Sequence, residues 1–182
     1  MEQHVTVRSA RDSDVEGIAA LLLDAFGADG RRVVRLVESL RPAHVRAELV
    51  AEVEGAVVGH TLLSHAWIDA PRALADVLVL SPLAVATAFQ RRGIGSALLG
   101  GAFAFAEELG APAIFPEGDP GYYSRQGFAA AEPLGFGRPS PRIPEAAFQV
   151  ALLDGHEEWM SGPVVYAEPF WTHDCVGLRH GR

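Results

Sequence analysis

A short turn rich in arginine and glycine is the part of this sequence best suited to chemistry. Residues 90–96 read Gln-Arg-Arg-Gly-Ile-Gly-Ser, between an apolar run that indicates a strand, residues 78–85, and an alanine- and leucine-rich run that indicates a helix, residues 97–109. The start of a helix leaves backbone N–H groups unpaired and carries a partial positive charge. Because Gly93 and Gly95 have no side chain, an anion could approach these N–H groups closely. The turn therefore predicts a binding site for phosphate or pyrophosphate.

Two common phosphate-binding motifs do not match this turn. A nucleotide P-loop contains a lysine directly after its last glycine, and no lysine follows a suitable glycine here. A dinucleotide-binding fingerprint needs a third glycine where this sequence has Leu98. The pattern that fits is Q/R-x-x-G-x-G/A, which residues 90–95 match. The alternative is a glycine turn that only packs a helix against a sheet.

This pattern resembles the acetyl-CoA loop of the GNAT N-acetyltransferases, and its surroundings strengthen the resemblance. Upstream, Leu83-Ala84-Val85 look like the family strand that carries "PLAV", and downstream residues 122–128 (YYSRQGF) resemble its Y-x-x-x-G-F signature. The resemblance runs from about Val5 to Phe170, nearly the whole chain. It implies an α/β fold with a central mixed, mostly antiparallel sheet that is splayed between two parallel strands, and with helices on both faces.

The resemblance also implies acetyl-CoA as the co-substrate and indicates which residues contact it. In the family a bulge in the central strand turns backbone N–H and C=O groups toward the pantetheine arm, and Pro82 favours such a bulge here. No metal is expected, because no His, Asp or Glu pair shows a recognised ligand spacing. The implied cofactor-binding residues are Leu83, Ala84 and Val85 on the strand and Gln90, Arg91, Arg92, Gly93, Ile94, Gly95 and Ser96 on the turn.

Transfer of an acetyl group to an amine also needs a proton donor for the departing thiolate. Tyr123 stands four residues before Gly127, where the family often carries its general acid, and a tyrosine hydroxyl with a pKa of about 10 can protonate sulfur. Tyr122 is the alternative, because adjacent helical residues point about 100° apart. No general base is evident from the sequence. The central strand, where many members of the family carry a Glu, offers only Asp76 near its start, and the turn beside the expected opening offers Glu117 and Asp119.

Length and composition limit the class of protein. The chain has 182 residues, 49% hydrophobic and 21% charged, which favours one folded domain over residues 1–182 with a core from about residue 4 to 170. The net charge of −8 argues against nonspecific nucleic-acid binding, and a single cysteine, Cys175, excludes an internal disulfide. With no signal peptide and no apolar stretch of about 18 residues, we expect a cytoplasmic protein without a membrane span, monomeric or weakly dimeric.

The first half of the chain predicts two helices and a strand pair. A short strand is expected at residues 4–7, followed by a helix that begins at Ser13 with a capping box and ends at Gly27. A second amphipathic helix ends at Pro42, and strands at residues 48–53 and 56–68 pair through a short turn. The second of these strands contains two histidines that we expect to be structural, His60 and His65.

The second half should carry the site. We expect the central strand at residues 73–85, the main helix at 95–109 and a buried strand at 112–115 that leads to the tyrosines. Residues 132–144, rich in proline and glycine, predict an irregular loop that lines the acceptor pocket together with the first two helices. Strands follow at 146–153 and 164–166, then residues 173–175, a surface segment, and a frayed tail, 177–182.

The function that this resemblance implies is N-acetyl transfer from acetyl-CoA to a primary amine. The acceptor is open, with a free small molecule favoured over a protein terminus. The alternative is a non-catalytic acyl-CoA-binding or regulatory module of the same fold: the missing base favours it, and the tyrosine pair at 122–123 disfavours it.

Overall fold

The computed structural model describes residues 4–177, in which strands and helices alternate irregularly. Five helices are present in this part of the chain: α1 (Val15–Phe26), α2 (Gly30–Leu40), α3 (Ile94–Glu108), α4 (Pro120–Ser124) and α5 (Glu168–Thr172). The strands are β1 (Thr6–Ser9), β2 (Val45–Val53), β3 (Ala56–Asp69), β4 (Leu74–Val85), β5 (Ala113–Pro116), β6 (Ala129–Ala130), β7 (Phe136–Gly137), β8 (Gln149–Leu152) and β9 (Gly162–Tyr166).

These strands join into one mixed sheet. Its main path runs β1-β2-β3-β4-β5-β8-β6, while β9 pairs with β3 beyond the end of β2 and also with β7. Every pair is antiparallel except β4–β5 and β7–β9, which are parallel. The fold expected from the sequence is therefore confirmed.

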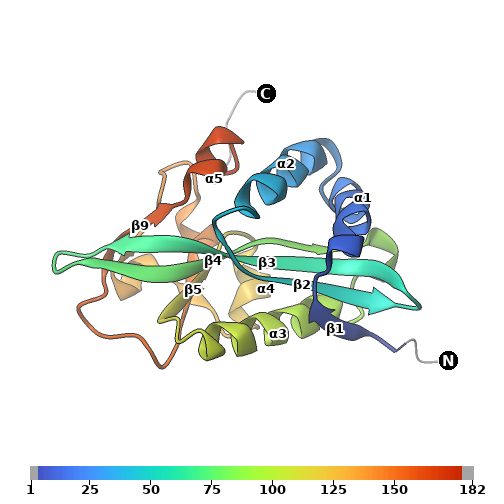
Figure 1. Ribbon diagram of the computed structural model, residues 1–182. Coiled ribbons are helices and arrows are strands. Elements are labelled where there is room, and N and C mark those ends of the chain that lie inside the picture. Colours follow the sequence, from blue (N-terminus) through green and yellow to red (C-terminus); the bar gives the residue numbers. More distant parts are fainter. Residues whose placement is uncertain (1–3, 178–182) are drawn as a thin grey trace.

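Helices cover both faces of the sheet. In Figure 1, α1 and α2 lie above the sheet and α3 lies below it. Strand β4 contributes apolar side chains to both faces, because successive side chains of a strand point to opposite sides of the sheet. Val77 and Val79 pack under α1 and α2, whereas Leu78 and Leu80 pack against α3.

The sheet opens between β4 and β5. The two strands pair only from Leu78–Leu80 on β4 and Ile114–Pro116 on β5, and in the described part of the chain the rest of β4 has no strand partner on that side. At the same point the pairing of β4 with β3 shifts register, because Ser81 and Pro82 on β4 lie opposite the single residue Leu62 on β3. The bulge expected at Pro82 is thus confirmed, and the two parallel strands diverge just beyond it.

Two details of the N-terminal half differ from expectation. The first strand is Thr6–Ser9 instead of residues 4–7. The N-cap residue of the first helix is Asp14, which makes no side-chain capping bond to that helix. Its carboxylate accepts the Arg11 N–H at 2.7 Å in the preceding 3-10 turn, which also contains Ser13. The expected Ser13 capping box was therefore wrong. The Asp14 carboxylate also pairs with Arg8, at 2.7 Å, which ties the helix start to β1.

The C-terminal half is more ordered than its composition indicates. Residues 132–144 contain a 3-10 turn and β7, which pairs with β9. The predicted frayed tail lies, except for Gly177, outside the described residues.

Candidate active site

The glycine turn forms the start of α3, as the sequence predicts. Gly93 is the N-cap of α3 and has a left-handed φ of 81°, a conformation that side chains with a Cβ rarely adopt. The first α-helical hydrogen bond runs from the Ala97 N–H to the Gly93 carbonyl, at 3.0 Å. The N–H groups of residues 94–96 come before this bond and have no partner within the helix. The turn therefore has the geometry of an anion site.

Contacts with β4 and α1 hold in place the turn and the residues directly before it. The Gln90 amide donates to the Val85 carbonyl at 3.2 Å, which ties the turn to the end of β4. The Thr87 N–H donates to the Asp24 carboxylate of α1 at 2.9 Å. The guanidinium of Arg92 lies over the Phe89 ring, 5.3 Å from its centre. The turn is thus positioned by β4 and α1 before any ligand binds.

A cavity of about 540 Å³ opens in front of the turn. This volume lies within the range of roughly 300–1,000 Å³ typical of small-molecule sites. Eight of the ten predicted cofactor-binding residues line it, and Arg92 and Ala84 do not. Phe89, Tyr122 and Arg125 line it as well, although no motif singled out Phe89 or Arg125.

The position of Ala84 follows from strand geometry. Its side chain is buried under α1 and α2, on the opposite face from Leu83 and Val85. The Ala86 N–H donates to the Val58 carbonyl of β3, and hydrogen-bonded pairs alternate along an antiparallel ladder. Ala84 therefore pairs its backbone with β3, while the backbone groups of Leu83 and Val85 face the opening left by β5. We conclude that Ala84 fits the predicted contact less well than its two neighbours.

The two tyrosines lie on α4, directly after the opening of the sheet. Asp119 caps this helix by accepting the Gly121 N–H at 2.8 Å. Gly127 has a φ of 93°, which turns the chain and brings Phe128 back onto Tyr123, with ring centres 5.4 Å apart. The Gly and Phe of the Y-x-x-x-G-F pattern therefore serve to pack the ring of Tyr123 against the core.

The two hydroxyls differ in their surroundings. The Tyr122 side chain is hydrogen-bonded to Ser96 on the turn, and a Cβ on Gly95 would lie 2.5 Å from the Tyr122 oxygen. Tyr123 is 8% exposed, and burial together with the neighbouring Tyr122 raises the pKa of its hydroxyl well above the usual value of 10. Tyr123 therefore keeps its proton across the physiological pH range, as a proton donor requires.

A second cavity of about 240 Å³ lies on the α1 and α2 side of the opening. It shares Leu83 and Tyr123 with the first cavity, so the two cavities meet where the strands diverge. Liquid water occupies about 30 Å³ per molecule, so this space corresponds to about eight water molecules. Its size suits a small molecule or a single side chain.

The walls of the second cavity carry both charge signs. Arg32 of α2 pairs with Asp29 at 2.8 Å, and Glu117, directly after β5, supplies a second carboxylate. The cavity is therefore acidic whenever Glu117 is ionised, because Asp29 already balances the charge of Arg32. Tertiary packing brings Arg32 of the amphipathic helix α2 to this wall.

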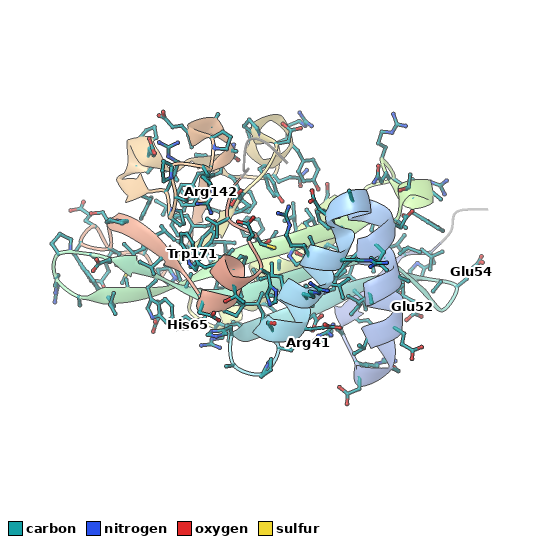
Figure 2. All side chains as sticks on the ribbon, turned by 90° about the horizontal axis from the view of Figure 1, so that it is seen from above. Arg41, Glu52, Glu54, His65, Arg142 and Trp171 are labelled. Atoms are coloured by element: carbon teal, nitrogen blue, oxygen red, sulfur yellow. The ribbon has the colours of Figure 1, made fainter. Side chains whose placement is uncertain are left out.

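Glu117 is the acidic residue best placed in this cavity. Burial raises the pKa of its carboxyl group to about 7, against the opposing effects of a hydrogen bond from the Gly177 N–H at 3.0 Å and of the charge on Arg142. Figure 2 shows Arg142 among the later segments, well separated from Arg41 beside the first helices. Arg41 serves a different carboxylate, Glu48, at 2.8 Å.

This raised pKa predicts a dependence of stability on pH. The folded protein prefers the protonated form of Glu117, so its contribution is fully present below about pH 4.5 and is lost as pH rises through about 7. We expect Glu117→Gln to be more stable than the wild type at pH 8, by about 3 kcal/mol at most in the free energy of unfolding, and therefore to have a higher Tm. At pH 4 the two proteins should have a similar Tm. Thermal denaturation of both proteins at the two pH values measures this. An equal Tm at pH 8 would contradict the burial argument.

The two strand histidines lie outside both cavities. His60 is fully buried and hydrogen-bonded to Glu48 at 2.9 Å. His65 is hydrogen-bonded to Asp76 at 2.7 Å, and it lies toward the opposite end of β3 from the turn that carries Glu54 (Figure 2). Asp76 is 79% exposed in its side chain and is therefore poorly placed to act as a base in either cavity.

The segment after α5 was wrongly expected to be surface only. Cys175 is half-buried and lines the second cavity, where burial raises the pKa of its thiol to about 11. His173 is hydrogen-bonded to Ser39 of α2, at 2.7 Å, and so does not activate the cysteine. Within residues 4–177 no group of three or more His, Cys, Asp or Glu side chains is arranged to hold a metal ion. In the same range no helix has the length and apolar character that a membrane crossing requires.

The expected acceptor loop is not part of the wall. Among the described residues, the second cavity is lined from α1, α2, β4, Glu117, α4 and the segment 175–177, but not from residues 132–144. That loop lies behind the wall, since a Cβ on Gly177 would come within 2.5 Å of the Arg142 backbone. Asp29, Arg32, Cys175 and Gly177 were missed because no local pattern marks residues that meet only in the fold.

Comparisons with known proteins agree with this architecture. The Acetyltransferase (GNAT) family profile matches residues 16–136. The uncharacterised N-acetyltransferase YjhQ of Escherichia coli (strain K12) is 30% identical over 174 residues, 91% of this chain and 94% of YjhQ. The uncharacterised N-acetyltransferase YhbS of the same strain is 33% identical over 162 residues, 86% of this chain and 93% of YhbS.

Two solved structures extend the likeness to three dimensions. The crystal structure of YhbS from Escherichia coli in complex with CoA superposes with a TM-score of 0.83 at 28% identity and covers 100% of this chain and 96% of that one. A GNAT family acetyltransferase from Brucella melitensis in complex with acetyl-CoA gives a TM-score of 0.75 at 28% identity, covering 93% and 99%. With its splayed sheet, its glycine turn and relatives that match along nearly their whole length, this chain belongs to the GNAT acetyltransferase family.

Proposed function

We propose that this protein, as a single GNAT domain, transfers an acetyl group from acetyl-CoA to a primary amine of a small molecule. The observation that carries the proposal is the meeting of two cavities at Leu83 and Tyr123, in the opening between β4 and β5. A donor in one cavity and an acceptor in the other would react at this junction. Holding both there makes the attack effectively unimolecular, which can supply a large part of the rate enhancement.

The first cavity is the proposed acetyl-CoA site. The unpaired N–H groups at the start of α3, with Arg91 at the cavity rim, would hold the pyrophosphate. The backbone groups of Leu83 and Val85 would bind the pantetheine arm and polarise the thioester carbonyl as charge develops on its oxygen. CoA and acetyl-CoA in the two structural relatives support this assignment.

The second cavity is the proposed acceptor site. Its modest volume of about 240 Å³ favours a small molecule over a folded protein surface. Its carboxylates, Asp29 and Glu117, favour an acceptor that arrives as a cation, as an alkyl ammonium does.

Tyr123 is the proposed general acid. It is the tyrosine that faces both cavities, and its raised pKa keeps it protonated until the thiolate departs. Tyr122 faces only the first cavity and is engaged with Ser96.

The proposal is tested by incubating the protein with acetyl-CoA and a panel of primary amines, in which small cationic amines are compared with peptides that carry a free N-terminus. We expect thiol release together with an acetylated small amine, identified by mass spectrometry, and little or no acetylated peptide. Binding of acetyl-CoA without transfer to any amine would favour a non-catalytic acyl-CoA-binding module instead. Faster transfer to peptides than to small amines would contradict the proposed acceptor class.

A further inference from the structure

We propose that Glu117 is the general base of this enzyme, a catalytic residue that takes a proton from the acceptor ammonium in the second cavity. The inference rests on the proposed function and adds the group that sequence patterns left open. Three observations carry it: the place of Glu117 at the opening of the sheet, the poor placement of the other acidic residues, and the groups that face its carboxylate.

Glu117 follows β5 at the point where this strand leaves β4. Pro116 makes the last pairing with Leu80 of β4, so Glu117 is the first residue on the diverging arm. Its side chain lines the second cavity together with Tyr123 and Leu83, which also line the proposed acetyl-CoA site. An amine in this small cavity therefore lies between the carboxylate and the thioester.

The other carboxylates near the site have different partners. Asp119 is exposed, outside the second cavity, and caps α4. Asp76 is bonded to His65 outside both cavities. Asp29 shares the second cavity but pairs with Arg32 at 2.8 Å, and its side chain is 63% exposed. Glu117 is the carboxylate there that no arginine contacts as an ion pair in the described residues.

The groups around Glu117 hold its carboxylate without neutralising it. The Gly177 N–H occupies one oxygen at 3.0 Å, and Arg142 contributes a favourable charge from a greater distance. The buried Tyr166 hydroxyl of β9 lies close enough to feel the charge of Glu117. The other charged or titratable side chains that line this cavity among the described residues are Arg32, Asp29, Cys175 and Tyr123. One carboxylate oxygen therefore stays available to an acceptor amine.

The proton balance of the reaction then closes. The ammonium gives one proton to Glu117, and its nitrogen, now with a lone pair, attacks the thioester carbonyl carbon. The C–S bond breaks, its electron pair goes to sulfur, and the Tyr123 hydroxyl protonates the thiolate. The new amide nitrogen gives its second proton to the Tyr123 oxygen, and Glu117 releases its proton to solvent. The products are the acetylated amine, CoA and one proton.

The raised pKa of Glu117 suits this role. A general base works best when its pKa lies near the working pH, because it is then ionised and still a strong proton acceptor. Burial places the pKa of Glu117 at about 7, whereas an exposed glutamate would be a weaker base.

The test is the pH dependence of kcat for the wild type, Glu117→Gln and Glu117→Asp, with acetyl-CoA and a small amine that the wild type acetylates. We expect the wild-type kcat to fall about tenfold per pH unit below about pH 7. Glu117→Gln should be about 10²-fold slower at pH 8 and lack this decline, so that the two rates converge at low pH. Glu117→Asp, which keeps an ionisable carboxyl group, should retain the decline.

Two controls separate this proposal from simpler explanations. Asp119→Asn removes the neighbouring carboxylate and keeps the helix cap, since Asn and Asp cap about equally well, so its kcat should stay within about twofold of the wild type. Calorimetric affinity of Glu117→Gln for CoA should equal that of the wild type.

Three results would overturn the assignment. A Glu117→Gln variant with wild-type kcat would exclude Glu117 as the base. A uniform loss that leaves the pH profile unchanged would give Glu117 a structural role only. Failure of the wild type to acetylate any amine would instead refute the proposed function, and the base assignment with it.

Discussion

Replacing Tyr123 with phenylalanine is expected to lower kcat by about 10²- to 10⁴-fold, the usual contribution of a positioned general acid. The change deletes only the hydroxyl and keeps the ring that packs edge-on against Phe128. Stability and CoA affinity should therefore change little. Steady-state kinetics with an accepted amine measures the effect, and calorimetry with CoA shows that the first cavity is intact.

Tyr122→Phe is the matched control for this prediction. It removes the same group from the adjacent residue, but the Tyr122 hydroxyl is engaged with Ser96 on the glycine turn and faces only the first cavity. We expect its kcat to stay near the wild-type value. The opposite ranking would move the acid role to Tyr122. If both single variants and the double variant react at the wild-type rate, neither tyrosine is the general acid. Water or substrate must then protonate the thiolate.

Substitutions in the glycine turn are expected to weaken CoA binding at least tenfold, which corresponds to about 1.4 kcal/mol. Gly93→Val forces a β-branched residue into a left-handed conformation, with a φ of 81°, at the cap of α3. Gly95→Ala adds a Cβ that would lie 2.5 Å from the Tyr122 hydroxyl and must displace it or the turn. Calorimetric titration with CoA measures both losses, and circular dichroism checks that the fold is retained.

Gly100→Ala is the control from the same helix. A Cβ there meets no atom within 4 Å, and alanine favours a helix over glycine by about 0.5–1 kcal/mol. This variant should bind CoA as the wild type does. Unchanged affinity in both turn variants would refute the pyrophosphate assignment.

A double variant separates the two causes at Gly95. Tyr122→Phe removes the nearest atom and leaves the ring carbon that bore it 3.5 Å from the new Cβ, an ordinary contact. If Gly95→Ala acts through Tyr122, the double variant should recover most of the lost CoA affinity. If it acts by keeping phosphate away from the backbone, the double variant should bind as weakly as Gly95→Ala.

Local sequence determined most of the main elements and the proposed donor side of the site. The run of β4, the glycine turn and α3 is continuous in the chain, so periodicity and the φ requirement at Gly93 identify it without tertiary information. Tyr123 was selected through the resemblance of residues 122–128 to the family signature, and Gly127 and Phe128, which hold its ring, lie within five residues of it. The bulge was predictable because proline removes a backbone donor from a strand.

The proposed acceptor side was decided only by the tertiary structure. Its wall joins Asp29 and Arg32 of the second helix region, Glu117 after β5 and Cys175 after α5, which are far apart in the chain. Nothing local distinguishes Glu117 from Asp119 two residues later. Folding partly buries the first and leaves the second exposed as a helix cap. Since burial sets the pKa of a carboxyl group, the chemistry of that wall exists only once distant segments have packed together.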